Sequence, residues 1–305
     1  MNLFWHRRDL RLQDNAGLAA AAAADTTLPV FVVDTDLLAT VGTRQRAFWV
    51  AGLRRLREAY RDRGSDLVVR EGPPADVLAD VAERYGVERV YYNDHYRPAR
   101  HDRQRQVDAA LPTESVTDLV LVDPARLEAA YPSHSQFYTD WQAVEKPAPY
   151  DSPASSALAD VTDDAAIPAI EADIDLLEAG YDAARRRFDR FLESGIETYN
   201  DTRDDMAAAV DRPVSAVSRL SPYLAAGMIG IREVWADATD RYAAASDDHA
   251  RKNIDKFRYE LSWREQNYHL LYYNPNLPTE NYKQIPNPIA WRNDTEEFTA
   301  WTRGE

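Results

Sequence analysis

The chain has 305 residues, 45% of them hydrophobic, so it can bury a core in two domains of ordinary size, and global disorder is not expected. It has no cysteine, which excludes disulfides and thiolate metal ligands, and none of its six histidines is spaced four residues from another, which argues against a metal enzyme. Its net charge of −15 argues against non-specific binding to nucleic acids, and no apolar run approaches the ~18 residues of a membrane helix.

The first part of the chain alternates strand-like and helix-like segments. Five short runs rich in β-branched and aromatic residues predict buried parallel strands: Asn2–Trp5, Pro29–Val33, Asp66–Val69, Arg89–Tyr92 and Asp118–Val122. Helical patterns lie between them, at residues 74–85, at residues 100–111 and after Thr43, a predicted N-cap. This alternation predicts a doubly wound parallel sheet, an α/β domain over residues 1–125.

The turn after the first strand, HRRDLRLQDN, contains no glycine. The glycine-rich turn that lets a pyrophosphate approach the backbone in dinucleotide-binding domains is therefore missing, and so is a phosphate-binding P-loop. An α/β domain of another kind is expected.

A connector is predicted over residues 126–175. Its second half, residues 151–175, holds seven acidic residues and no lysine or arginine, which predicts a solvated linker wrapping the surface. Only four of the chain's 36 basic residues are lysines. A chain so acidic and poor in lysine is typical of a halophilic cytoplasm, and an ordinary acidic protein is the alternative.

Residues 176–305 show helical patterns and no convincing strand, which predicts an all-α domain. Its most informative helix covers residues 251–273. Ile254, Phe257 and Leu261 share a face that should lie in the core, and Glu260, Trp263 and Asn267 fall on an adjacent side. An indole is a stacking platform for a base, and a carboxylate and an amide can bond a base's edge. The alternative is a helix that buries Trp263 and solvates Glu260.

Three further segments are candidates for binding. Ser218, Arg219 and Ser221 precede Pro222 at a predicted helix start, where hydroxyls and free backbone N–H groups suit a pyrophosphate, although an ordinary N-cap is the alternative. Tyr199 and Arg203 could reach one ligand together from a helix, or form a surface pair. Trp291 is a lone loop tryptophan whose alternative role is to anchor that loop.

In combination these segments resemble the cryptochrome/photolyase family, and specifically its class I deoxyribodipyrimidine photolyases. The resemblance rests on residues 4–18 (FWHRRDLRLQDNAGL), 90–107 (VYYNDHYRPARHDRQRQV), 199–204 (YNDTRD), 218–227 (SRLSPYLAAG) and 260–278 (ELSWREQNYHLLYYNPNLP). It runs over most of the chain and is weakest in the acidic linker. It implies light-driven repair of cyclobutane pyrimidine dimers in ultraviolet-damaged DNA by electron transfer from reduced FAD. The alternatives are a cryptochrome-type blue-light receptor and a nucleotide-binding α/β domain with a vestigial tail.

The resemblance also implies roles for individual residues. Glu260 and Trp263 would act on the extruded dimer, and Trp291 would be the outermost tryptophan of the relay that photoreduces the flavin. The cofactor-binding residues would be Tyr199, Val217, Ser218, Arg219, Leu220, Ser221, Phe257 and Arg264. The DNA-binding residues would be Arg203, Glu260, Trp263 and Asn267. The α/β domain would hold an antenna chromophore, a folate or a deazaflavin, and the protein would be a monomer that does not contact membranes.

The chain departs from the family pattern in three places. Val217 replaces a threonine that the family usually has, and the segment AAYPSHSQFYTDW is shortened, which questions the antenna site. The sequence ends at AWTRGE, where the family continues into further helices, so an incomplete flavin domain with weak FAD binding is expected.

Overall fold

The computed structural model describes residues 1–283, 286, 290 and 292–305. A five-stranded parallel sheet forms the centre of the N-terminal domain, in the order β3-β2-β1-β4-β5. The strands are β1 (Asn2–His6), β2 (Thr27–Val33), β3 (Val68–Glu71), β4 (Arg89–Asn93) and β5 (Thr113–Val116). The predicted fold class is confirmed, and the order reverses between β1 and β4, where an open α/β sheet forms its binding crevice.

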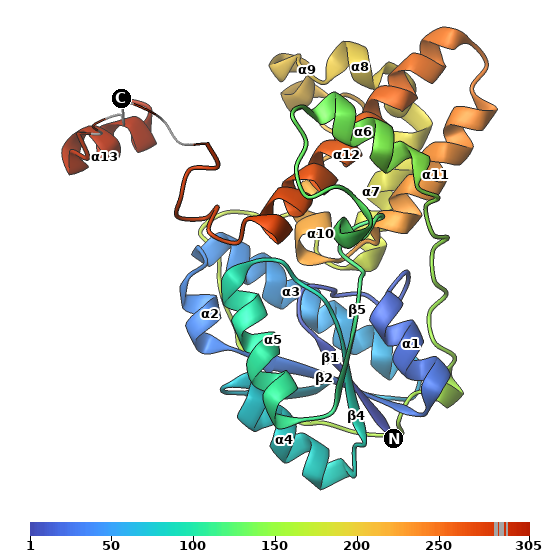
Figure 1. The fold of residues 1–305 in the computed structure, drawn as a ribbon, viewed down its shortest axis with the longest axis vertical. Helices are drawn as coiled ribbons and strands as arrows, with labels where there is room; N and C mark the ends of the chain where they lie inside the picture. Colours follow the sequence, from blue (N-terminus) through green and yellow to red (C-terminus); the bar gives the residue numbers. More distant parts are fainter. Residues whose placement is uncertain (284–285, 287–289, 291) are drawn as a thin grey trace.

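Helices cover both faces of the sheet (Figure 1). Phe4 packs with residues of α1 (Ala16–Ala24) and α3 (Thr43–Arg61), whereas its neighbours Leu3 and Trp5 pack with residues of α4 (Pro74–Tyr85) and α5 (Pro98–Ala110). This alternation follows from the two-residue period of a strand and explains the uniformly apolar strand sequences. A short helix, α2 (Thr35–Ala39), follows β2.

Two local predictions in this domain are wrong. The fifth strand is Thr113–Val116, not Asp118–Val122. Val120, Leu121 and Val122 are buried, but beneath the helical domain, where Leu121 and Val122 donate backbone hydrogen bonds to the Glu265 carboxylate. An apolar run buried on all sides resembles a strand in sequence whatever its partners are. Thr43 is the first residue of α3 rather than its N-cap, which is Gly42.

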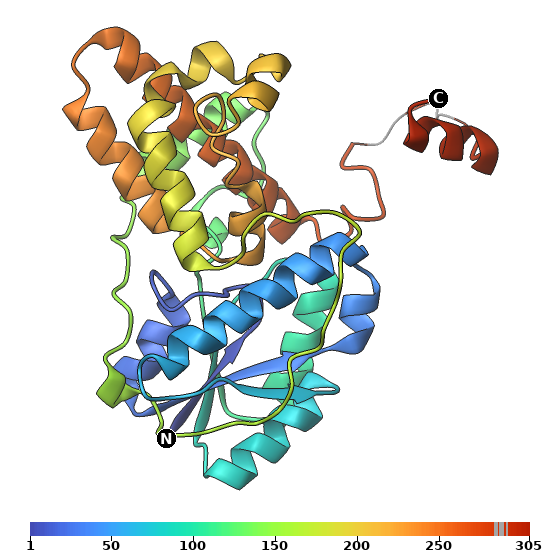
Figure 2. The same cartoon turned by 180° about the vertical axis from the view of Figure 1, so that it is seen from behind.

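The predicted connector is more structured than its composition indicates. The 3-10 turn η1 (Pro124–Arg126) leads into it, and its first half contains α6 (His134–Ala143), which packs on the helical domain. The acidic half then returns along the α/β domain, as Figure 2 shows, and includes the turn η2 (Ser155–Ala157). It is pinned there, because Leu158 bridges Thr27 and the buried Asp163 carboxylate accepts the backbone N–H of Val69.

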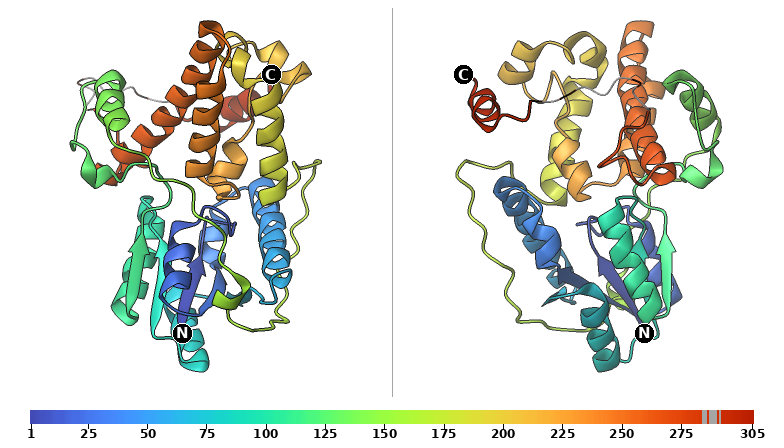
Figure 3. Two further views of the ribbon diagram at one scale, coloured as in Figure 1. Left: turned by 90° about the vertical axis from the view of Figure 1, so that its right-hand side faces the viewer. Right: turned by 60° about the vertical axis from the view of Figure 1, so that its left-hand side comes forward.

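The C-terminal half is helical, as predicted, and lies above the sheet (Figure 3). Its elements are α7 (Tyr181–Ser194), η3 (Ile196–Thr198), α8 (Tyr199–Thr202), α9 (Met206–Asp211), α10 (Ser221–Ala226), α11 (Ile231–Ala244), α12 (Asp248–Tyr273) and α13 (Thr295–Arg303). Helix α13 stands away from the body and buries none of its residues.

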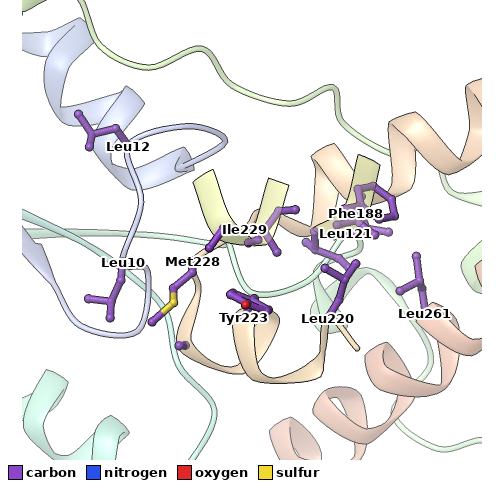
Figure 4. Packing of buried hydrophobic residues seen from close by; sticks show 14 of the residues in the cluster. Leu10, Leu12, Leu121, Phe188, Leu220, Tyr223, Met228, Ile229 and Leu261 are labelled. Carbon is purple, nitrogen blue, oxygen red and sulfur yellow. The ribbon is translucent and has the colours of Figure 1, made fainter. Parts of the chain in front are cut away.

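One hydrophobic cluster runs through both domains. Leu10 and Leu12, in the loop after β1, belong to the same cluster as Tyr223, Met228 and Ile229 of the helical domain (Figure 4). The two domains therefore share a core, and the sheet edge and α12 are held in a fixed relation. No helix among the described residues is long and apolar enough to span a membrane.

Candidate lesion and cofactor sites

Helix α12 carries the main group of predicted site residues. Asp247 caps its N-terminus through the backbone N–H of Ala250, and Ile254, Phe257 and Leu261 anchor one face in the core. The alternative interpretation, a helix that buries Trp263, is wrong, because the Trp263 side chain is 41% exposed. Glu260 is partly exposed and Asn267 exposed, so the three residues that the spacing placed on one side of the helix all have accessible surface.

The Glu260 carboxylate is fixed through one of its two oxygens. Oε1 accepts from Arg203 Nη1 at 2.9 Å and pairs with Lys256 Nζ at 2.7 Å. Among the described residues Oε2 has no hydrogen-bond partner, so this oxygen remains an acceptor for a ligand. The structure thus brings together two residues that sequence analysis treated separately, Arg203 and Glu260. It adds Lys256, which lies one turn before Glu260 on the same helix.

Trp263 has a partner that sequence analysis did not identify. The imidazole of His134, the first residue of α6, stacks on the indole with ring centroids 3.7 Å apart and planes 7° from parallel. His134 was considered only as one of six histidines that lack metal-ligand spacing. The signal that could have drawn attention to it is its place in the segment where the sequence departs from the family pattern.

Asn267 and Arg264 are engaged by the protein itself. The Asn267 amide donates to the carbonyl of Trp263 at 2.8 Å, within the helix. Arg264 Nη1 donates to the Leu119 carbonyl at 2.9 Å, and its guanidinium lies 4.9 Å from the centre of the Tyr268 ring. Arg264 therefore joins α12 to the α/β domain.

The hydroxyl-bearing segments predicted for FAD are neighbours in space. Thr202 of α8 donates to the Ala216 carbonyl at 2.8 Å, which joins the Tyr199 turn to the segment before α10. Tyr199 packs edge-on against Phe191 and Phe257, and burial raises the pKa of its phenol. Ser218 is partly buried, Ser221 is exposed, and Val217, which precedes them, is partly buried. The two segments are thus joined, and hydroxyl donors of the kind they carry suit a diphosphate.

Two predicted cofactor residues lie in the hydrophobic core. Phe257 and Leu220 are 4% and 2% exposed, and both belong to the shared hydrophobic cluster. The burial of Phe257 agrees with its place on the predicted core face, and contact of either residue with a flavin stays a prediction. Arg219 has a left-handed φ of 49°, and its side chain donates to the Ala209 carbonyl at 2.6 Å. Trp291 lies outside the described residues.

A second candidate site lies at the carboxyl edge of the sheet. Two adjoining pockets there share Arg7, Phe31, Leu38 and Trp49 in their linings. Arg8 and Arg100 lie 5.1 Å and 5.8 Å from the centre of the Trp49 ring, and neither makes an ion pair among the described residues. Burial lowers the pKa of Arg8 to about 10, and nearby Arg97 and Arg264 contribute to this. Unpaired cations beside an indole suit a planar, anionic ligand.

The same region contains a buried imidazole with a free nitrogen. His95 Nε2 has no hydrogen-bond partner in the described part of the chain, and burial lowers the pKa of His95, with Arg100 and Arg8 adding to the effect. No group of three or more His, Cys, Asp or Glu side chains in the described part of the chain is arranged to hold a metal ion.

Comparison with known proteins gives the family. The model of the DNA photolyase family matches residues 2–156. The chain is 38% identical to the deoxyribodipyrimidine photo-lyase of Halobacterium salinarum, covering 100% of this chain and 68% of that protein. It is 33% identical to the deoxyribodipyrimidine photo-lyase of a Synechococcus strain, covering 99% of this chain and 67% of that protein.

Solved structures agree. A class III photolyase from Agrobacterium tumefaciens matches with a TM-score of 0.79 and 27% identity, over 99% of this chain and 65% of that chain. An archaeal photolyase from Sulfolobus tokodaii, solved with two FAD molecules, matches with a TM-score of 0.79 and 26% identity, over 100% of this chain and 67% of that chain. The chain therefore belongs to the DNA photolyase family, as predicted, and spans about two thirds of the length of these relatives.

Proposed function

We propose that this chain is a deoxyribodipyrimidine photo-lyase that repairs cyclobutane pyrimidine dimers in DNA with light. The observation that carries the proposal is the exposed Trp263 indole next to the Glu260 carboxylate, on a helix whose other face is firmly packed. The photo-lyase names of several relatives support the same enzyme class.

The residues divide the work as follows. Trp263 stacks on the extruded dimer, and Glu260 Oε2 accepts a hydrogen bond from the N–H of a pyrimidine edge. Arg203 and Lys256 hold the carboxylate through Oε1 and, as cations, lie where a DNA phosphate would approach. Trp291 remains a proposed relay residue. Stacking tolerates salt better than phosphate contacts do, which suits a chain of net charge −15.

FAD is the proposed catalytic cofactor. The hydroxyls of Tyr199, Ser218 and Ser221 would hold it, and the donor chemistry of this group fits its diphosphate. When bound and reduced, it supplies the electron that splits the dimer. The protein itself shields the electron donor and the lesion from water and holds them at a fixed distance from each other. The packed helix α12 is suited to this task.

Illumination of dimer-containing DNA tests this function directly. The chain is mixed with FAD under reducing conditions, and dimer loss is followed by absorbance. Trp263→Ala and Glu260→Gln should abolish or strongly reduce light-dependent repair, and Trp263→Ala should weaken dark binding of damaged DNA at least about fivefold. Trp301→Ala, which removes an exposed tryptophan of α13, is the control and should match the parent. A flavin-loaded chain that changes its spectrum in light but removes no dimers would favour the receptor alternative.

We also propose the carboxyl-edge crevice as the antenna chromophore site. Its Trp49 ring and the unpaired Arg8 and Arg100 favour a flat, negatively charged molecule. Binding of a deazaflavin, a flavin nucleotide or a folate is measured by fluorescence quenching. Trp49→Ala should lower the affinity for whichever of these ligands binds. Equal binding by Trp49→Ala and parent would contradict this placement.

A further inference from the structure

His134 makes the face-to-face contact with Trp263, and the two side chains differ sharply in exposure. The His134 side chain is nearly enclosed at 6% exposed, whereas Trp263 is 41% exposed. Trp263 makes no aromatic contact other than His134 among the described residues. One face of the indole is therefore covered by a fixed ring, and the exposed surface of the indole lies on its remaining sides.

The imidazole is itself held at both nitrogens by α12. Nδ1 lies 2.9 Å from the Tyr259 hydroxyl and Nε2 lies 3.0 Å from Ser262 Oγ. Ser262 Oγ donates its proton to the Tyr259 carbonyl at 2.7 Å, so it accepts from Nε2–H of the imidazole. The Tyr259 hydroxyl then donates to Nδ1. This network assigns a neutral imidazole protonated at Nε2, with both nitrogens satisfied.

The surroundings favour this neutral form. Burial lowers the pKa of His134; the Glu260 carboxylate opposes this and the Lys256 ammonium adds to it. The other groups packed against the ring are aromatic side chains, those of Phe137 and Tyr138 from α6 and those of Tyr259 and Trp263 from α12.

We propose that His134 is a positioning residue for repair: its clamped imidazole fixes the plane of the Trp263 indole and thereby prepares the free indole face for a pyrimidine dimer. This rests on the proposed function of Trp263. An unsupported tryptophan would have to lose its rotamer freedom when the lesion binds, and that cost reduces affinity. The clamp removes the cost in advance, because α6 and α12 already fix both rings.

The stack is tested first in the free protein, without DNA or flavin. The chain has only six histidines, so their imidazole Hε1 signals are followed by proton NMR, and substitution of His134 assigns its signal. Ring current from the indole should shift this signal upfield in the parent and leave it at an ordinary position in Trp263→Leu. An unshifted His134 signal in the parent would overturn the proposal whatever the chain does to DNA.

Dark binding of dimer-containing and undamaged oligonucleotides then tests the consequence. His134→Ala should lower the preference for damaged DNA about 3- to 10-fold. His134→Phe retains a flat ring without the hydrogen bonds and should restore the preference to within about twofold of the parent. Both variants are first shown to unfold at a midpoint close to the parent's, and His134→Leu, which fills the space without a flat ring and should lower the preference likewise, replaces His134→Ala if the alanine variant does not fold.

The outcomes separate the two proposals. A parent that prefers damaged DNA while His134→Ala retains that full preference would overturn the role of His134 and leave the repair function intact. The opposite outcome is a shifted His134 signal in a parent that shows no preference for damaged DNA and binds it no better than Trp263→Leu does. That result would reject the proposed function instead.

Discussion

Asp9 is the residue at which the loop after β1 is fixed to the sheet edge. Its Oδ1 accepts the backbone N–H of Arg7 at 2.8 Å, its Oδ2 accepts from the Asn93 amide, and the ring of His6 lies 3.4 Å away. Burial by itself would raise the pKa of Asp9, but the His6 contact, the Arg7 N–H and the Arg11 charge outweigh it and lower the pKa to about 2.

The low pKa of Asp9 predicts a loss of stability in acid. The folded protein holds the ionised form more tightly than the unfolded chain, whose ordinary value is 3.8. The carboxylate's contribution is therefore complete above about pH 4 and is lost as the pH falls from 3.8 towards 2. Asp9→Asn should cost about 3 kcal/mol at pH 7, because its amide N–H faces existing donors. Urea unfolding between about pH 2.5 and 7 measures the acid loss of stability and the cost of Asp9→Asn. An equal pH slope in parent and Asp9→Asn would contradict the lowered pKa of Asp9.

At the scale of elements, the start of α11 is capped by the other domain. Asp14 Oδ2, in the loop after β1, accepts the backbone N–H groups of Arg232 and Glu233, both at 3.1 Å. Gly230 is the N-cap, and a β-carbon on it would lie 1.8 Å from Asp14 Oδ2. The carboxylate can reach the helix end only because this position has no side chain.

A pair of glycine substitutions tests this cap. Gly230 has an ordinary φ of −79°, so alanine there is opposed only by the Asp14 contact. Gly230→Ala should lower the free energy of unfolding by at least about 2 kcal/mol. Gly42 is the N-cap of α3, and a β-carbon on it would meet nothing within 4 Å, so Gly42→Ala is the matched control. Its effect should stay below about 1 kcal/mol, and similar effects of both variants would refute the interpretation.

At the scale of the whole molecule, a buried charge network joins the two domains. Arg232 of the helical domain bonds Asp14 Oδ1 at 2.6 Å and also bonds Asp118 Oδ1, while Arg11 bonds Asp118 Oδ2 at 2.7 Å. All four side chains are at most 5% exposed. Burial alone would raise the pKa of Asp118, but the charges of Arg11 and Arg232 lower it. The domain interface is thus ionic as well as apolar.

The network and the acidic surface should respond differently to salt. Arg232→Ala removes the cation that pairs with the buried Asp14 carboxylate. It should lower the free energy of unfolding by about 3–5 kcal/mol at both low and high KCl, since buried charges are little screened. Arg44→Ala removes an exposed pair with Asp173 and should change stability little. The parent itself should gain stability with added KCl, because screening relieves repulsion within a chain of net charge −15. Denaturant midpoints at several KCl concentrations measure all three, and a salt-dependent Arg232→Ala effect would contradict the buried-network account.

Sequence patterns succeeded where one element decides the outcome. The buried face of α12 at Ile254, Phe257 and Leu261 follows from helical spacing, and so does the common side of Glu260, Trp263 and Asn267, whereas the exposure of Trp263 was left open by the spacing. They failed where the partner lies far along the chain. The run Asp118–Val122 has the composition of a strand, but it lies beneath the helical domain. Its N–H groups at Leu121 and Val122 bond Glu265 of α12, more than 140 residues away.

The order of residues by itself determined the parallel sheet, the helical second half and the buried face of α12, because these follow from periods of about 2 and 3.6 residues. Only the tertiary structure decided that His134 covers one face of Trp263, that Arg203 pairs with one oxygen of Glu260, and that Leu220 belongs to the core. Each of these facts is a contact between segments with no common periodicity, and such contacts depend on how the helices pack rather than on any local pattern.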